Sequence, residues 1–192
     1  MNYIITYTGK KFDYLNITPD SIDIDDIIHA LPRINRFVGH SSRPYSVGEH
    51  TIYCYTMAQK LGYTPRQQLV TFLHDFTEAY VGDCPSPLKK LLPSFEEIEY
   101  EVERAIYQKL NIPMPTEEEY ELIKKVDLTM LVIEMRDLTL HNHEEFINDY
   151  IYTNMLEDNE FKLSRKVHYK EEDIQLLLKM IFRKLMNDSN II

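Results

Sequence analysis

The sequence predicts an all-α fold that begins with a short β-hairpin. Four times a Ser or Thr is followed three residues later by Glu or Gln, where apolar periodicity begins: Ser46/Glu49, Thr64/Gln67, Ser94/Glu97 and Thr116/Glu119. This pattern is the capping box, in which two side chains satisfy backbone N–H groups at a helix start. The C-terminal stretch also has an apolar stripe at helical spacing, formed by Ile174, Leu177, Met180, Ile181 and Leu185. Helices are therefore expected along most of the chain.

The expected elements follow the chain in order. Residues 3–15 alternate around Thr8-Gly9-Lys10-Lys11, which is typical of a hairpin. Helices are then expected near residues 22–30, 46–61, 65–80, 94–110, 117–140, 143–156 and 171–187. Pro65 occupies the first position of the helix at 65–80, where its missing N–H has no cost because that group would have no partner inside the helix.

Length and composition limit the classes of protein. A chain of 192 residues favours a single domain over residues 1–192, with residues 1–20 as a hairpin arm and residues 143–192 as helices that complete the bundle. The formal net charge of −10 excludes an overall basic surface for duplex nucleic acid or an anionic membrane. The apolar runs are too short for a membrane span, and the start of the sequence lacks the apolar core of a signal peptide, so a cytoplasmic location is expected.

The two cysteines give no sign of a disulfide framework. Cys54 and Cys84 form neither a CxxC nor a CxxxC pair, so a thiolate zinc site is not indicated either. Both are expected to act as small buried hydrophobic residues.

Several polar side chains fall on helix faces that otherwise carry apolar residues. His50 lies on the stripe of the helix at 46–61, and His74 and Asp75 flank the stripe of the next helix. Asp127 and Glu134 lie near the apolar face of the helix at 117–140. Burying a carboxylate is costly unless a cation or hydrogen-bond donors satisfy it.

Two interpretations account for these groups. Taken singly, His50 would be a satisfied core histidine, and Asp127 and Glu134 would pair with Lys124, Arg136 or another basic side chain. Taken together, two His and two Asp from three successive helices match the mixed nitrogen and oxygen ligands of divalent transition metals: His50, His74, Asp75 and Asp127. A metal bound in this way activates water and polarises substrate oxygens, which suits phosphoester hydrolysis. The joint pattern favours the metal interpretation.

Glu78 lies one helical turn beyond the His74-Asp75 pair. In the metal interpretation it orients the water or relays a proton. The alternative is a surface carboxylate that pairs with a lysine.

Local positive charge offers a place for phosphate. Residues 30–50 carry three arginines and one glutamate, a local net charge of 3 − 1 = +2, from Arg33, Arg36, Arg43 and Glu49. His40 is a further donor in this segment, and Lys89 and Lys90 would add charge if the preceding turn folds back. Phe37 could stack on a base, although an aromatic residue at this spacing is more often part of the core. Glu49 is explained by its capping box.

These residues resemble the HD-domain metal-dependent phosphohydrolases. The chain is most similar to a small nucleotide-directed branch that includes bacterial 5′-deoxynucleotidases and phage dATP triphosphohydrolases. The matching passages run in order through residues 1–138: IDDIIHAL from Ile24, RFVGH from Arg36, YSVGEH from Tyr45, HDFTEAY from His74, GDCPSPLK from Gly82, DLTML from Asp127 and EMRDL from Glu134. The rest of the chain carries no diagnostic motif.

The resemblance implies an all-α HD-domain bundle in which His50, His74, Asp75 and Asp127 hold one divalent ion. It also implies roles for further residues: Glu78 positions water, Asp83 lies near the sugar or the water, Arg36 and Lys89 contact phosphate, and Phe37 borders the base. Some relatives carry Trp where this chain has Phe37, a departure that bears on base preference.

Three functions are compatible with this resemblance. The favoured one is a 5′-nucleotidase that converts deoxynucleoside monophosphates to nucleoside and phosphate, because few cationic residues are available for three phosphates. The alternatives are a dNTP triphosphohydrolase and a nucleotide-sensing HD module. The expected cofactor is one divalent transition metal (Mn, Co, Fe, Zn or Ni), the expected partner is a small nucleotide, and a homo-oligomer is expected from the family.

Overall fold

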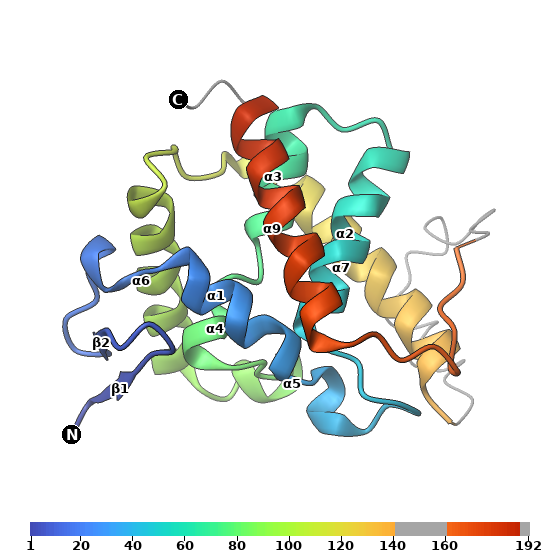
Figure 1. Cartoon of the computed structure of the whole chain (residues 1–192), viewed down its shortest axis with the longest axis horizontal. Helices are drawn as coiled ribbons and strands as arrows, with labels where there is room; N and C mark the ends of the chain where they lie inside the picture. The colour runs from blue at the N-terminus through green and yellow to red at the C-terminus, as the bar shows by residue number, and fades with distance from the viewer. Residues whose placement is uncertain (141–160, 189–192) are drawn as a thin grey trace.

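The computed structural model describes residues 1–140 and 161–188 (Figure 1). Strands β1 (Tyr3–Ile5) and β2 (Lys11–Asp13) form an antiparallel hairpin in which Ile4 lies opposite Phe12. The described remainder is helical or irregular. The predicted all-α fold with an N-terminal hairpin is confirmed, whereas the helix expected at 143–156 lies outside the described residues.

Helices make up most of the described chain. Their bounds are α1 Ile24–Ala30, α2 Val47–Lys60, α3 Pro65–Leu73, α4 Glu78–Val81, α5 Ser86–Lys89, α6 Pro93–Lys109, α7 Glu117–Leu138 and α9 Glu171–Asp188. Short 3₁₀ turns are η1 Pro19–Ser21, η2 Leu31–Arg33 and η3 Arg36–Gly39. No described helix is long and apolar enough to cross a membrane.

Local capping explains where several helices begin. Thr64 and Thr116 form complete capping boxes at the starts of α3 and α7, as predicted. Ser46 caps α2 by accepting from the Glu49 N–H at 3.1 Å, but the Glu49 carboxylate binds Arg43 at 2.8 Å and does not complete a box. The box expected at Ser94 is wrong, because α6 already starts at Pro93, which needs no partner for an N–H.

The continuous helix expected over 65–80 is interrupted by a tight turn at residues 74–77. In this turn the Phe76 N–H donates to the Leu73 carbonyl at 3.0 Å, and the Glu78 N–H donates to the Asp75 carbonyl at 3.1 Å. Hydrogen bonds that span three residues place side chains i and i+3 above one another. Asp75 and Glu78 therefore lie on the same side of the chain.

The core lies around α2, which packs against α3, α7 and α9. Figure 1 shows α9 running alongside α2 and α3. One buried apolar cluster joins the hairpin, α1, α3, α6 and α9, and it includes Phe12, Ile27, Phe72, Ile106 and Leu178. A second cluster joins α2 to α7 and includes Tyr45, Cys54, Met130, Ile133 and Leu163. The polar residues predicted to form a site lie where α2, the end of α3 and α7 meet.

Gly48 allows α2 to approach its neighbours closely. A Cβ atom at this position would lie 2.9 Å from Ile174 Cγ2 and 3.1 Å from the Pro32 backbone nitrogen. We expect Gly48→Ala to lower the free energy of unfolding by roughly 1–2 kcal/mol, because overpacking outweighs the better helix propensity of alanine. Urea denaturation measures this loss. Adding Ile174→Ala should cost less in the Gly48→Ala background than in the wild type, and an unchanged urea midpoint for Gly48→Ala would contradict the close packing.

Candidate metal centre

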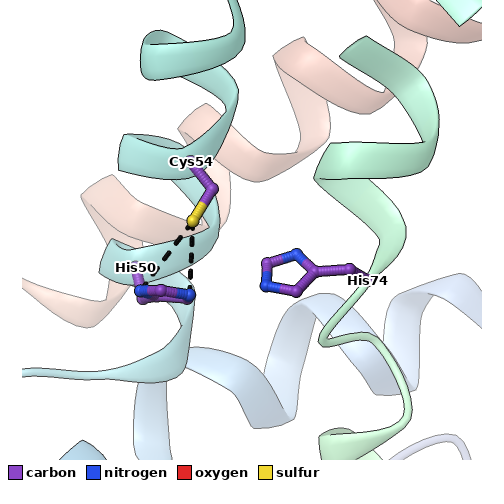
Figure 2. Close-up of side chains that lie close together, drawn as sticks. All are labelled: His50, Cys54 and His74. Carbon is purple, nitrogen blue, oxygen red and sulfur yellow. Dashed lines mark hydrogen bonds between the residues drawn. The ribbon is translucent and has the colours of Figure 1, made fainter. Parts of the chain in front are cut away.

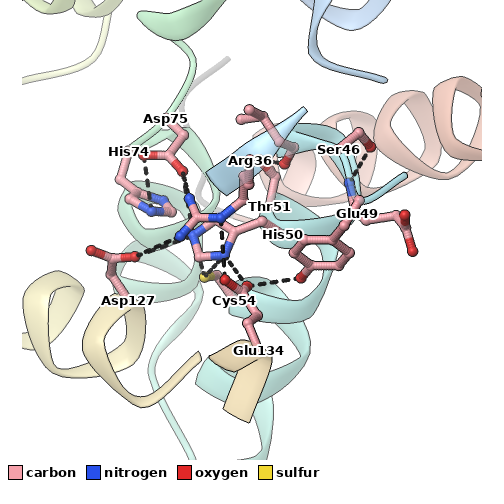
Figure 3. A network of polar contacts seen from close by, with 12 residues as sticks. Arg36, Ser46, Glu49, His50, Thr51, Cys54, His74, Asp75, Asp127 and Glu134 are labelled. Atoms are coloured by element: carbon pink, nitrogen blue, oxygen red, sulfur yellow. Dashed lines mark hydrogen bonds and ion pairs between the residues drawn. The ribbon is translucent and has the colours of Figure 1, made fainter. Parts of the chain in front are cut away.

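The structure brings together the four side chains predicted as metal ligands. His50 Nε2, on the first turn of α2, lies 3.3 Å from Asp75 Oδ2 and 3.2 Å from Asp127 Oδ1. His74 Nε2 lies 3.2 Å from Asp75 Oδ1. Figure 3 shows these groups facing one another from α2, the turn after α3, and α7. Two imidazoles and two carboxylates thus share one small space.

A hydrogen bond of His74 determines which of its two ring nitrogens is available to bind a metal ion. His74 Nδ1 lies 2.7 Å from the Thr71 carbonyl oxygen, which can only accept, so Nδ1 carries the proton and Nε2 keeps its lone pair. This Nε2 atom is buried and has no hydrogen-bond partner among the described residues. Metal-binding histidines are oriented in this way, with one nitrogen bonded to a carbonyl or carboxylate and the other directed at the ion.

His50 lies in a strongly negative environment. Its Nδ1 is 2.5 Å from Glu134 Oε1, and its ring is completely buried. Burial and the Arg36 charge oppose ionisation, but Cys54, Glu134 and Asp127 outweigh them, so the pKa of His50 is raised well above its ordinary value. The surroundings of Nε2 therefore favour positive charge, which a divalent cation would also supply.

Glu134 connects this histidine to two further groups. It is fully buried, accepts a hydrogen bond from the Tyr45 hydroxyl at 2.8 Å and pairs with Arg36 Nε at 3.2 Å. The expected pairing of Glu134 with a basic side chain is confirmed, but the partner is Arg36 and not Lys124 or Arg136, since Arg136 binds Asp137 at 2.8 Å. The basic partner comes instead from a segment 98 residues away.

Arg36 presents its guanidinium to the carboxylates of the site. Besides Glu134, it lies 3.5 Å from Asp75 Oδ2 and 4.0 Å from Asp127 Oδ1, and its side chain is 11% exposed. The residue that follows it, Phe37, has a φ of 56°, in the left-handed region that few non-glycine residues adopt.

A pocket of about 300 Å³ is lined by two of the four ligand candidates, Asp75 and Asp127. Its charged lining is Arg36, Asp75, Glu78, Asp83, Lys89 and Asp127. Its apolar lining includes Phe37, Pro85, Pro87, Leu128, Leu131 and Met135. His40 is exposed and does not line this pocket, so the structure does not bring it to the other predicted substrate-binding residues.

The basic residues separate into two groups. Lys89 lines the pocket and pairs with Glu99 at 2.7 Å, whereas Lys90 is exposed. Arg33 pairs with Glu171 at 2.7 Å and Arg43 with Glu49 at 2.8 Å. Neither of these arginines lines the pocket.

Glu78 is a pocket residue with an unusual proton affinity. It is only 6% exposed, and its Oε2 atom has no hydrogen-bond partner in the described chain, so it is not a surface carboxylate. Burial, followed by the charges of Asp75 and Asp83, raises the pKa of Glu78 well above its ordinary value. Burial also raises the pKa of Asp83. A buried carboxyl group whose pKa is raised in this way can act as a general acid or base that exchanges a proton with a substrate.

The raised pKa of Glu78 predicts a pH-dependent stability. The folded, metal-free chain holds this proton above the ordinary value of 4.5, so the contribution of Glu78 is present below pH 4.5 and is lost as pH rises through the folded pKa. Glu78→Gln should therefore become increasingly more stable than the wild type as pH rises. Thermal unfolding of metal-stripped protein across pH 4–8 measures the difference, with the exposed Glu118→Gln as control. Parallel curves for Glu78→Gln and the wild type would contradict the raised pKa.

Sequence reasoning missed Cys54 as a member of this cluster. It is fully buried, as expected, but its Sγ lies 3.2 Å from His50 Nε2. His50, Cys54 and His74 each place one potential ligand atom within 4.8 Å of the others (Figure 2). The signal was a cysteine four residues after a histidine, on the same helix face. Cys84, which was also expected to be buried, is only half-buried and lines the pocket instead.

The donor set fits a divalent transition metal. Imidazole nitrogen and carboxylate oxygen are both ligands of such ions, and the buried, unpartnered Nε2 of His74 is a nitrogen that a cation would satisfy. His50, His74, Asp75 and Asp127 are the residues that would hold it.

Comparison with known proteins gave relatives and a fold. No family model matches the chain. It is 39% identical to the uncharacterized protein YfdR of Escherichia coli over 143 residues, 73% of this chain and 74% of YfdR. It is 29% identical over 111 residues to the uncharacterized protein RCAP_rcc00048 of Rhodobacter capsulatus, 55% of this chain and 57% of that one. Among solved structures it is similar to the HD phosphohydrolase DatZ of cyanophage S-2L, bound to dA and one catalytic Zn²⁺, with a TM-score of 0.50 and 18% identity over 86% of this chain and 98% of DatZ.

Proposed function

Because the chain belongs to the family of YfdR and has the HD phosphohydrolase fold, we propose that it is a divalent-metal-dependent phosphohydrolase acting on nucleotides. The observation that carries the proposal is the convergence of His50, His74, Asp75 and Asp127, of which the two aspartates line one pocket. The bound metal would supply Lewis acidity toward a phosphoryl oxygen and a nucleophile derived from water.

The residues that line the pocket are assigned the other roles in hydrolysis. Glu78 orients the attacking water and holds or moves its proton, helped by the raised pKa that burial and, after it, the charges of Asp75 and Asp83 give it. Arg36 and Lys89 offer positive charge to the phosphate. Asp83 lines the same pocket and is assigned to the sugar or the water.

The apolar wall is assigned to the nucleoside. Phe37, Leu128, Leu131 and Met135 line the same pocket as the carboxylates, and such apolar surfaces suit a base. DatZ is a phosphohydrolase whose structure contains dA, which supports a purine deoxynucleoside among the first candidates.

We favour a 5′-nucleotidase that releases nucleoside and phosphate from deoxynucleoside monophosphates. Arg36 and Lys89 are the only lysine or arginine side chains among the described residues that line the pocket, and both are already paired with carboxylates. Three phosphates would need more positive charge. The alternative is a dNTP triphosphohydrolase that releases triphosphate, and a further alternative is a nucleotide-sensing module.

The deciding experiment incubates metal-loaded protein with separate dNMPs, dNTPs and ribonucleotides and resolves the products by anion-exchange chromatography. Nucleoside released from dNMPs supports the 5′-nucleotidase, and triphosphate released from dNTPs overturns it in favour of the triphosphohydrolase. Binding without turnover across several metals would leave the sensing module.

The single domain, the cytoplasmic location and the self-association expected from the sequence stay predictions.

Lys89 and Lys90 provide a matched test of the phosphate assignment. Lys89 lines the pocket and its exposed neighbour Lys90 does not. We expect Lys89→Ala to reduce kcat/KM about tenfold or more, as the loss of a charge-assisted contact of about 1.5–3 kcal/mol predicts. Lys90→Ala should stay within about twofold of the wild type. Equal effects of the two substitutions in steady-state kinetics would remove Lys89 from the phosphate site.

A further inference from the structure

We infer that Cys54 supplies a sulfur ligand to the metal centre and biases this centre toward thiophilic metals such as zinc. The inference rests on the proposed function, because it concerns the same centre. It goes beyond the nitrogen and oxygen set of His50, His74, Asp75 and Asp127, which by itself accepts a wide range of divalent ions.

The position of the sulfur is the first support. Cys54 lies one turn after His50 on α2, and its Sγ is 3.2 Å from His50 Nε2 and 3.9 Å from Nδ1. It is therefore closer to the nitrogen that faces the carboxylates than to the nitrogen bound by Glu134. Figure 2 shows the sulfur and both imidazoles bordering the same space.

The second support comes from His74, which belongs to a different element. Its side chain is 10% exposed, and its Nε2 has no hydrogen-bond partner among the described residues. Figure 2 shows its ring directed toward His50 and Cys54. The three potential ligand atoms lie within 4.8 Å of one another, so small side-chain adjustments would bring them to one ion. Two nitrogens and one sulfur form a set typical of zinc.

Binding replaces the S–H bond by a sulfur–metal bond, and the thiol proton passes to solvent. Thiolate ligands favour zinc, whereas sites of carboxylate, carbonyl and water suit magnesium and manganese. With Cys54 as a ligand, this centre would therefore prefer zinc over manganese more strongly than a centre with only imidazole and carboxylate ligands.

Cobalt spectroscopy tests the inference without measuring activity. Metal-stripped full-length protein, reduced with a phosphine, is titrated with Co²⁺. We expect visible ligand-field bands together with a near-ultraviolet sulfur-to-cobalt charge-transfer band. Cys54→Ser should lose the charge-transfer band and keep the visible bands, while Cys84→Ser should keep both. In competition experiments, Cys54→Ser should lower the preference for Zn²⁺ over Mn²⁺ by about tenfold or more.

The outcomes separate this inference from the proposed function. Visible bands without charge transfer in the wild type, or charge transfer that survives in Cys54→Ser, would overturn the sulfur ligand and leave the metal centre intact. No cobalt bands at all would overturn both. Because the wild-type spectrum alone can refute the inference, it does not depend on the folding of a variant, and Cys54→Val offers a second substitution that keeps an apolar side chain at this buried position.

Discussion

Replacing Asp75 by alanine is expected to remove metal binding and turnover together. Asp75 faces His50, His74 and Arg36 at 3.2–3.5 Å, so its loss would delete a proposed ligand and a carboxylate that compensates the Arg36 charge. Substituting outer partners of metal ligands costs about 10–100-fold in affinity or activity, and losing a ligand itself should exceed this range. Metal analysis after dialysis and the nucleotide panel measure the two effects.

Asp25→Ala is the matched control for this substitution. This substitution also removes an aspartate carboxylate, but the Asp25 side chain is 60% exposed and pairs with Lys179 on the surface. A surface ion pair of this kind contributes little to stability. Metal content and turnover should stay at the wild-type level in Asp25→Ala. A full equivalent of metal retained by Asp75→Ala would show that Asp75 is not a ligand.

Glu134→Leu is expected to produce the largest loss of stability. Glu134 is completely buried and meets His50, Arg36 and the Tyr45 hydroxyl. Removing one partner of a buried ionic network costs about 3–5 kcal/mol, because the remaining charges lose their compensation. Metal affinity should also fall about 10–100-fold, since the carboxylate no longer orients the imidazole.

Urea denaturation and metal titration measure these two effects separately. Glu134→Gln keeps an acceptor of the same shape and should lose less stability than Glu134→Leu. Glu118→Leu, the same change at an exposed position of α7, should stay within about 0.5 kcal/mol of the wild type. A loss below about 1 kcal/mol for Glu134→Leu would contradict the central place of this carboxylate.

The helix starts and ligand candidates that the sequence predicted depend on patterns of residues close to one another along the chain. Thr64 and Thr116 begin helices through hydrogen bonds to residues three positions away, so their capping boxes located α3 and α7. His50, His74, Asp75 and Asp127 stood out because polar groups on apolar faces need partners, and the fold brings them together.

The features that escaped prediction depend on distant contacts or on the backbone. Glu134 finds Arg36 across 98 residues, a pairing that no local pattern contains. His40 was expected near the phosphate, but Phe37 and Val38 adopt positive φ values of 56° and 52°, which helix and turn propensities do not anticipate for such residues. Cys54 escaped because its approach to the site depends on a neighbouring histidine, His50, and not on a second cysteine.

The turn at residues 74–77 makes the number of residues in this segment as important as their identity. Its three-residue hydrogen bonds place Asp75 and Glu78 on one side of the chain. Inserting a single alanine after Phe76 would keep every candidate ligand but turn Glu78 away from the pocket by roughly 100–120°. Relatives can therefore exchange the side chains around the pocket more freely than they can lengthen or shorten this turn. An alignment gap between Asp75 and Glu78 would mark a relative whose chemistry has changed, even where all the ligand residues are retained.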